Sequence, residues 1–127
     1  MALKRTELKR SKLAHKRKKT QAKKERQKAK RLEQLEKRLH YQTVCERVDD
    51  RDGGCCVECG SPYPEHHHVR FRGQGGQDDI ENIVSLCSWC HKYSPTSPHQ
   101  SRVGRLKWVE WAKKKYPNYW GEVRERA

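Results

Sequence analysis

Two Cys-x-x-Cys pairs constrain the fold of this chain more than any other feature of its sequence. Cys56 and Cys59 form the first pair, and Cys87 and Cys90 form the second. Four thiolates in two close pairs are the ligand set of a tetrahedral structural zinc site. The central segment is therefore predicted to fold around Zn²⁺, which would stabilise a small module as much as its apolar core does.

Two further cysteines lie outside this pattern. Cys55 directly precedes the first pair and could replace Cys56 in a shifted register. We favour Cys56, because its spacing to Cys59 repeats the spacing of the second pair. Cys55 and Cys45 are therefore predicted to be free thiols.

The composition allows one small domain and an appendage. The chain has 127 residues, of which 32% are apolar, and this is too few for two cores. Six cysteines could instead mark a secreted disulfide scaffold. However, the N-terminus is basic throughout, and no apolar stretch follows the charges as in a signal peptide. No run approaches the roughly 20 apolar residues of a membrane helix. We therefore expect a reducing, intracellular location and no membrane partner.

The positive charge is concentrated at the N-terminus. Residues 1–40 carry 17 Lys/Arg and four Asp/Glu, which is +13 of the formal net charge of +14. Such a segment is typical of a solvated arm that neutralises nucleic-acid phosphates, so it would supply affinity without sequence preference. A tail without a partner and a localisation signal are the alternatives. The cations expected to contact DNA are Lys16, Arg17, Lys18, Lys19, Lys23 and Lys24.

Local patterns predict an α+β order of elements. Residues 21–48 consist mainly of good helix formers, with Leu32, Leu35 and Leu39 at i, i+3 and i+7, and predict a helix that follows a partly disordered or helical arm. Residues 51–54 would form the turn that ends it. The elements expected next are a strand over 65–71, a glycine-rich loop over 72–76, a strand over 80–86, a short helix over 87–92 and a C-terminal helix over 102–116. The aromatic residues of the last segment are expected to complete a small core.

The central segment resembles a known family. The matching residues are Arg51–Gly60, His67-His68-Val69, Gly75-Gly76, Asp79–Cys87 and Cys90-His91. In this order the residues resemble the HNH nucleases, whose fold is the small ββα-metal module, or His-Me finger. The likeness is greatest to small zinc-containing HNH proteins of bacteriophages and mobile elements. It implies a nuclease domain over residues 41–127, with its core at 51–95, that cleaves DNA phosphodiesters in the cytoplasm of a bacterial host.

The resemblance also implies roles for individual residues. His68 matches the general base that removes a proton from the attacking water, and imidazole suits this role because its pKa of about 6.5 leaves it neutral near pH 7. His67 and His91 match the ligands of a catalytic divalent ion, which would be Mg²⁺, Mn²⁺ or another metal. Asn82 matches the residue whose amide fixes the loop and so orients the base.

The three consecutive histidines leave a question of register. On a strand, His66 and His68 share one face and His67 lies on the other, so an adjacent base and ligand would require a local twist or a bulge. The pair His67-His68 places Val69 at a position that is apolar in the family, whereas the pair His66-His67 would place His68 there. We favour the first pair, which leaves His66 facing solvent or supporting the site. His99 could add a further ligand, but the long gap from His91, with two prolines in it, argues against this.

Two functions from different classes fit these residues. Arg70 and Arg72 recur on one face of the predicted strand and could grip the scissile phosphate or be ordinary solvated charges. A metal-dependent DNA endonuclease would use the histidines and Asn82, whereas a noncatalytic zinc-knuckle DNA-binding module would not require them. The sequence therefore favours the nuclease, with DNA as its partner and with a homodimer or other phage DNA-processing proteins as further candidate partners.

Overall fold

The structure is a computed structural model that describes residues 2–121. The chain divides into two compact units, Met1–Leu39 and His40–Ala127. None of the described helices is both long and apolar enough to cross a lipid bilayer. Mixed helices, a two-stranded sheet and a cluster of four cysteines confirm the predicted α+β class.

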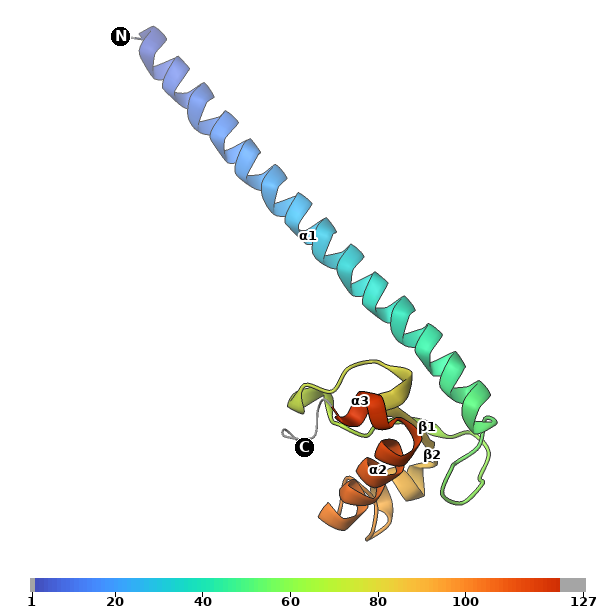
Figure 1. The fold of residues 1–127 in the computed structure, drawn as a ribbon. Coiled ribbons are helices and arrows are strands. Elements are labelled where there is room, and N and C mark those ends of the chain that lie inside the picture. Colours follow the sequence, from blue (N-terminus) through green and yellow to red (C-terminus); the bar gives the residue numbers. More distant parts are fainter. Residues whose placement is uncertain (1, 122–127) are drawn as a thin grey trace. The chain divides into compact units, whose positions relative to one another are not determined.

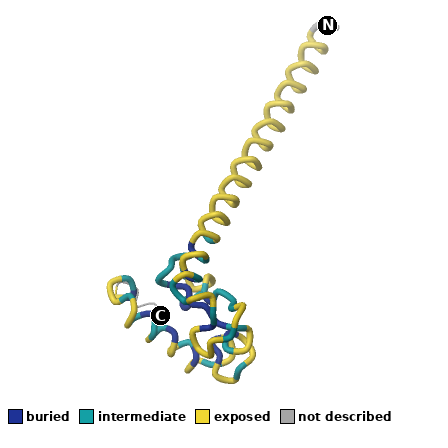
Figure 2. Tube along the Cα trace, turned by 90° about the vertical axis from the view of Figure 1, so that its right-hand side faces the viewer, coloured by how far each residue is buried: buried dark blue, intermediate teal, exposed yellow. Residues whose placement is uncertain are grey.

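The first helix, α1, spans Ala2–Asp52 and is longer than the helix predicted over 21–48 (Figure 1). Residues 2–52 contain neither glycine nor proline, and the stretch before residue 21 is rich in Lys, Arg, Leu and Ala, which also favour a helix. The side chains of residues 4–40 are exposed throughout (Figure 2). α1 ends where Gly53 and Gly54 adopt positive φ angles of 73° and 68°, a conformation that glycine adopts without steric cost.

The sheet consists of β1 (Glu65–His68) and β2 (Ile83–Leu86), which pair in antiparallel register, with His67 opposite Val84. Both strands are shorter than predicted. Beyond His68, the amide of Val69 still donates to the carbonyl of Asn82 at 2.8 Å, but the next amide, of Arg70, donates to the Asn82 side chain at 2.9 Å. A side chain therefore replaces the backbone ladder at this end of the sheet, and the predicted strand residues 80–82 form a 3₁₀ turn, η2 (Ile80–Asn82).

A tight loop connects the two strands. It contains the 3₁₀ turn η1 (Arg72–Gln74), followed by Gly75 with a φ of 85°. A Cβ atom on Gly76 would lie 1.8 Å from the carbonyl oxygen of Arg70, so only glycine fits there. The predicted glycine-rich loop is thus closed against its own first residues.

Three short or medium helices follow the sheet. The predicted helix over 87–92 is the π-helical turn η3 (Trp89–Tyr93), and α2 (Arg102–Lys115) agrees with the predicted C-terminal helix. A further helix, α3 (Pro117–Gly121), was not predicted. Proline is well tolerated at the first position of a helix, because its missing N–H would have no partner there.

Two apolar clusters position the sheet. The larger one joins Val84 and Leu86 of the sheet to Trp108 and Ala112 of α2 and Trp120 of α3. The burial of these aromatic residues confirms that they complete a core. The smaller cluster packs Val44 and Val48, from the end of α1, against Ile83 of β2.

A polar clamp holds the end of α1 to the same strand. Asp52 accepts hydrogen bonds from the guanidinium of Arg51 at 2.8 and 2.9 Å and from the amide of Ser85 at 3.0 Å. Arg51 in turn donates to the carbonyls of Ile80 and Ile83. Both faces of β2 are consequently covered, and all four of its residues are buried.

Candidate metal centre and catalytic site

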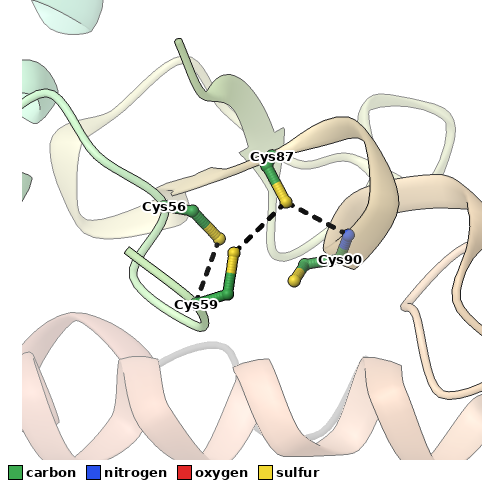
Figure 3. A group of neighbouring side chains, drawn as sticks. All are labelled: Cys56, Cys59, Cys87 and Cys90. Carbon is green, nitrogen blue, oxygen red and sulfur yellow. Dashed lines mark hydrogen bonds between the residues drawn. The ribbon is translucent and has the colours of Figure 1, made fainter. Parts of the chain in front are cut away.

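The four paired cysteines come together in the structure (Figure 3). Their sulfur atoms all lie within 4.8 Å of one another. The amide of Cys59 points at the sulfur of Cys56, and the amide of Cys90 points at the sulfur of Cys87, each at 3.5 Å. Gly60, with a φ of 78°, allows the first of these turns. This arrangement fits a tetrahedral zinc site, and Cys45 and Cys55 are not part of the cluster.

The thiols of this cluster differ in acidity. A hydrogen bond from the Ser61 hydroxyl, with further bonds to Cys87 and Cys56, lowers the pKa of Cys59 to about 6. Burial raises the pKa of Cys90, with hydrogen bonds to the other cysteines acting in the same direction. Because only thiolates bind zinc, loading of the cluster would release protons.

A second group of potential ligands consists of three histidines. His67 lies on β1, His91 on η3, and His99 in the loop before α2, and their ligand nitrogens lie within 4.8 Å of one another. Nε2 of His91 lies 2.9 Å from Nε2 of His99. His67 is 1% exposed, and its Nε2 atom is buried without a hydrogen-bond partner among the described residues. A buried nitrogen without a partner is rare and requires an explanation, which a bound cation would supply.

His99 belongs to this group although the sequence argued against it. Pro98, one of the two prolines in the gap, helps to place the residue, since Ser97 and Pro98 are buried beneath α2. At Gly104 of α2, a Cβ atom would lie 2.3 Å from the carbonyl oxygen of Thr96, so the loop and the helix are in direct contact. Arg105 also donates to the carbonyl of Pro98 at 3.2 Å. The loop is therefore anchored, and this brings His99 back to His91.

Glu65 orients His91 and was missed by the sequence reasoning. Its Oε2 atom lies 2.6 Å from Nδ1 of His91, and its Oε1 atom accepts from the hydroxyl of Ser88 at 3.0 Å. The hydrogen bond to His91 lowers the pKa of Glu65, so the carboxylate is ionised and accepts the Nδ1 proton. Nε2 of His91 is then left with a lone pair. The available signal was spacing, because Glu65 and His67 are two residues apart and share a face of β1.

All three imidazoles of the group favour the neutral form. Burial is the main cause for each, and it lowers the pKa of His67 to about 3. Burial also lowers the pKa of His91, although Glu65 opposes it, and that of His99. Neutral imidazoles that converge at one point, with a carboxylate behind one of them, are the donor set of a transition-metal site.

His68 has different partners from its neighbour His67. Its Nε2 atom lies 2.8 Å from Oδ1 of Asp78, and its ring stacks on Tyr41 with centroids 5.9 Å apart. The guanidinium of Arg72 lies over the same Tyr41 ring, 4.7 Å from its centroid, and donates to Asp78 at 3.1 Å. Burial opposes ionisation of Asp78, but the hydrogen bond to His68 and the charge of Arg72 outweigh it and lower the pKa. Sequence reasoning missed both Asp78 and Tyr41.

Asn82 fixes the loop between the strands. It is 1% exposed. Its side-chain oxygen accepts from the amide of Arg70 at 2.9 Å, and its side-chain nitrogen donates to the carbonyls of Arg70 and Gln77 at 3.1 and 2.9 Å. The loop that carries Asp78 is thereby held in place. Asn82 thus acts on the surroundings of His68 without contacting its ring.

Of the local twist or bulge expected at the histidines, β1 contains no bulge. Each residue of β1 pairs with one residue of β2, so no bulge separates His67 from His68. Adjacent side chains nevertheless reach one cavity of about 340 Å³, because the strand ends at His68. Nε2 of His66 lies 2.7 Å from Oδ1 of Asp49. The cavity is lined by His66, His67, His68, Phe71, Arg72, His91, Lys92 and His99.

The basic residues selected from the sequence fall in different places. Arg72 lines the histidine cavity, whereas Arg70 does not. The Nε atom of Arg70 donates to the carbonyl of Gln74 at 3.0 Å. β1 ends before either arginine, so the two residues do not share a strand face. The arm residues Lys16, Arg17, Lys18, Lys19, Lys23 and Lys24 are all exposed on α1.

Comparison with known proteins adds one finding. Residues 56–94 match the family model described as HNH endonuclease. The match contains both cysteine pairs, His67, His68 and His91, and it ends before His99 and α2. No curated protein and no solved structure gives a match to the chain.

Proposed function

We propose that this chain, whose residues 56–94 match the HNH endonuclease family model, is a metal-dependent endonuclease that hydrolyses DNA phosphodiester bonds. One observation carries the proposal. The buried Nε2 atom of His67, which has no hydrogen-bond partner within residues 2–121, lies close to His91 and His99 in a cavity that His68 also lines. A noncatalytic zinc-knuckle module would gain nothing from this arrangement, since a buried nitrogen without a partner only costs stability.

The residues present fit a catalytic divalent ion held by His67, His91 and His99. Three neutral imidazoles suit Mn²⁺, Co²⁺, Ni²⁺ or Zn²⁺ better than Mg²⁺, which prefers oxygen ligands. Such an ion, when bound, would stabilise the negative charge that develops on the phosphoryl group and the leaving oxygen. The zinc ion of the four cysteines would have a different task, which is to hold the fold.

His68 is proposed as the general base. In the tautomer whose Nε2–H donates to Asp78, Nδ1 retains a lone pair and can take a proton from water as the water oxygen bonds to phosphorus. The bond from phosphorus to the 3′ oxygen breaks, and the leaving oxygen takes a proton from solvent, so the products are a 5′ phosphate and a 3′ hydroxyl. The Asp78 carboxylate would stabilise the imidazolium that forms. Asp78 is a positioning residue in this proposal, because it acts through His68.

Binding to DNA is proposed to come largely from the arm. Residues 1–40 carry +13 of the net charge, and the side chains of residues 4–40 are exposed. Each phosphate that they neutralise would release counterions, which makes binding strong and sensitive to salt. The arm would therefore deliver DNA to a small domain that offers few contacts of its own.

The biological setting is also a proposal. The likeness to small zinc-containing phage proteins, with thiols that require a reducing compartment, supports a role in phage DNA processing such as packaging, in the cytoplasm of a bacterial host. A double-strand break requires two active sites, so a homodimer or successive nicking would be needed. Other phage DNA-processing proteins are further candidate partners.

The test is cleavage of a supercoiled plasmid by the full chain with a panel of Mn²⁺, Co²⁺, Ni²⁺, Zn²⁺ and Mg²⁺. His68→Ala is expected to lower the rate by about 10²- to 10⁴-fold, the usual contribution of a general base. His66→Ala serves as the matched control and should lose much less, because His66 bonds to Asp49 instead. Absence of metal-dependent cleavage by the wild type would refute the nuclease proposal. Full activity in His68→Ala would refute the choice of base.

A further inference from the structure

A second cavity, which no sequence motif indicated, lies next to the histidine cavity. It has a volume of about 180 Å³ and contains three arginines, Arg70, Arg102 and Arg105, with Phe71 and Trp120 among its other lining residues. Arg70 follows β1, whereas the other two arginines lie on the first turns of α2. We call these three side chains and the cavity between them the arginine cleft.

The charges of the arginine cleft are not neutralised by the described part of the chain. No Asp or Glu of residues 2–121 lines the cleft, and none forms an ion pair with its arginines. Among residues 2–121, the side chain of Arg102 has no hydrogen-bond partner, whereas those of Arg70 and Arg105 donate only to backbone carbonyls. Other cations of the domain differ in this respect: Lys107, also on α2, pairs with Glu58, and Arg51 pairs with Asp52.

The position of Arg102 on its helix is electrostatically unfavourable. Ser101 is the N-cap of α2, so Arg102 is the first helical residue, and the first turn contains no acidic residue. The N-terminus of a helix carries partial positive charge and favours anions, whereas a cation there costs stability. An anion in the cleft would relieve this repulsion and would also meet guanidinium groups, whose planar fork suits phosphate oxygens.

Phe71 connects the cleft to the histidine cavity. Its side chain lines both cavities, and its ring stacks on His99 with centroids 5.1 Å apart and planes at 11°. A DNA strand with one phosphate at the histidines would therefore have its backbone next to the cleft. Since backbone phosphates recur at every nucleotide, a neighbouring phosphate is the anion best placed to enter it.

We propose that the arginine cleft binds a backbone phosphate of the DNA strand adjacent to the phosphate that is cleaved. This inference rests on the proposed function for its substrate. It assigns to α2 a contact that fixes the DNA strand over the histidines. The arm, in contrast, supplies affinity without selecting a particular phosphate. Contacts to phosphates set the position and register of DNA on a protein.

The test compares two charge reversals on the same helix, in the full chain. Arg102→Glu and Lys114→Glu change the net charge equally, but Lys114 is an exposed residue near the other end of α2. DNA affinity is measured over a range of salt concentrations without added divalent ion, so that no cleavage is needed. For Arg102→Glu we expect at least tenfold weaker binding at moderate salt and a plot of log K against log salt that is shallower by about 0.9, the value for one phosphate. Lys114→Glu should have a smaller effect on both the DNA affinity and the salt dependence.

The thermal midpoint of unfolding separates binding from folding. An acidic residue at the start of α2 interacts favourably with the helix dipole, so Arg102→Glu should unfold at the same temperature as the wild type or above it. Equal effects of the two variants on DNA binding, or no effect of either, would overturn the proposal. Inorganic phosphate, added at constant ionic strength, could stabilise the wild type but not Arg102→Glu. If the two proteins also bound DNA equally well, the cleft would be a site for free phosphate, and the proposal would be overturned. A failure to cleave plasmid would refute the nuclease proposal without altering these outcomes.

Discussion

Removal of the Glu65 carboxylate should weaken binding of the catalytic metal ion while leaving the zinc cluster intact. Glu65 accepts the Nδ1 proton of His91 at 2.6 Å and so fixes the ring with its Nε2 lone pair toward His67 and His99. Loss of such a partner of a histidine ligand typically lowers metal affinity by about 10- to 100-fold, or about 1.4 to 2.7 kcal/mol.

The structure indicates where in this range each variant should fall. The side chain of Glu65 is 38% exposed, so water screens part of its charge. Glu65→Gln retains an oxygen that can accept the Nδ1 proton and loses only the screened charge, so we expect about a tenfold loss. Glu65→Ala loses both the charge and the hydrogen bond and leaves the ring free to rotate, so it should approach the upper limit of about 100-fold.

The assay is a titration of the zinc-loaded chain with Co²⁺, monitored by calorimetry. Absorption is recorded in parallel, because thiolate charge-transfer bands would reveal any exchange of Co²⁺ into the cysteine site. Glu58→Gln is the matched control, since Glu58 pairs with Lys107 and does not contact a histidine. Wild-type affinity in Glu65→Ala, or an equal loss in Glu58→Gln, would refute the reasoning.

Two further predictions concern the other parts of the chain. Cys87→Ser should lose zinc and unfold the domain, whereas Cys45→Ser should retain both, as measured by metal content and circular dichroism; equal zinc loss in the two variants would contradict the ligand assignment. Deletion of residues 1–30 should weaken DNA binding and make its salt dependence shallower with unchanged metal content, and an unchanged slope would show that the arm does not contact DNA.

The sequence predicted the cysteine cluster well because the information is local. Each Cys-x-x-Cys pair is one turn of chain, and two matching turns define a zinc site almost without regard to the rest of the fold. The order of strand, loop, strand and helix was likewise readable from residue patterns. The strands were predicted to be longer than they are. Beyond His68, hydrogen bonds to the Asn82 side chain replace those of the backbone ladder, and this replacement leaves no periodic signal in the sequence.

The second site was predicted less completely because its parts are brought together by tertiary contacts. His99 was set aside on account of the intervening prolines, yet the packing of Ser97 and Pro98 under α2 is what returns the chain to His91. Asp78 lies in a loop whose path depends on the buried amide of Asn82. Neither contact can be inferred from spacing along the chain.

The two clusters of potential metal ligands are coupled through a single turn of the chain. Cys90 and His91 are adjacent in η3, and the amide of His91 donates to the carbonyl of Cys87 at 2.8 Å. Zinc on Cys87 and Cys90 would therefore fix the backbone from which His91 reaches its partners. A π-helical turn, which is rare overall but enriched at functional sites, places the adjacent residues Cys90 and His91 in two different clusters. The zinc cluster should then act on catalysis through the position of His91, so a variant that loses zinc should also lose the histidine-bound ion, although none of its histidines has changed.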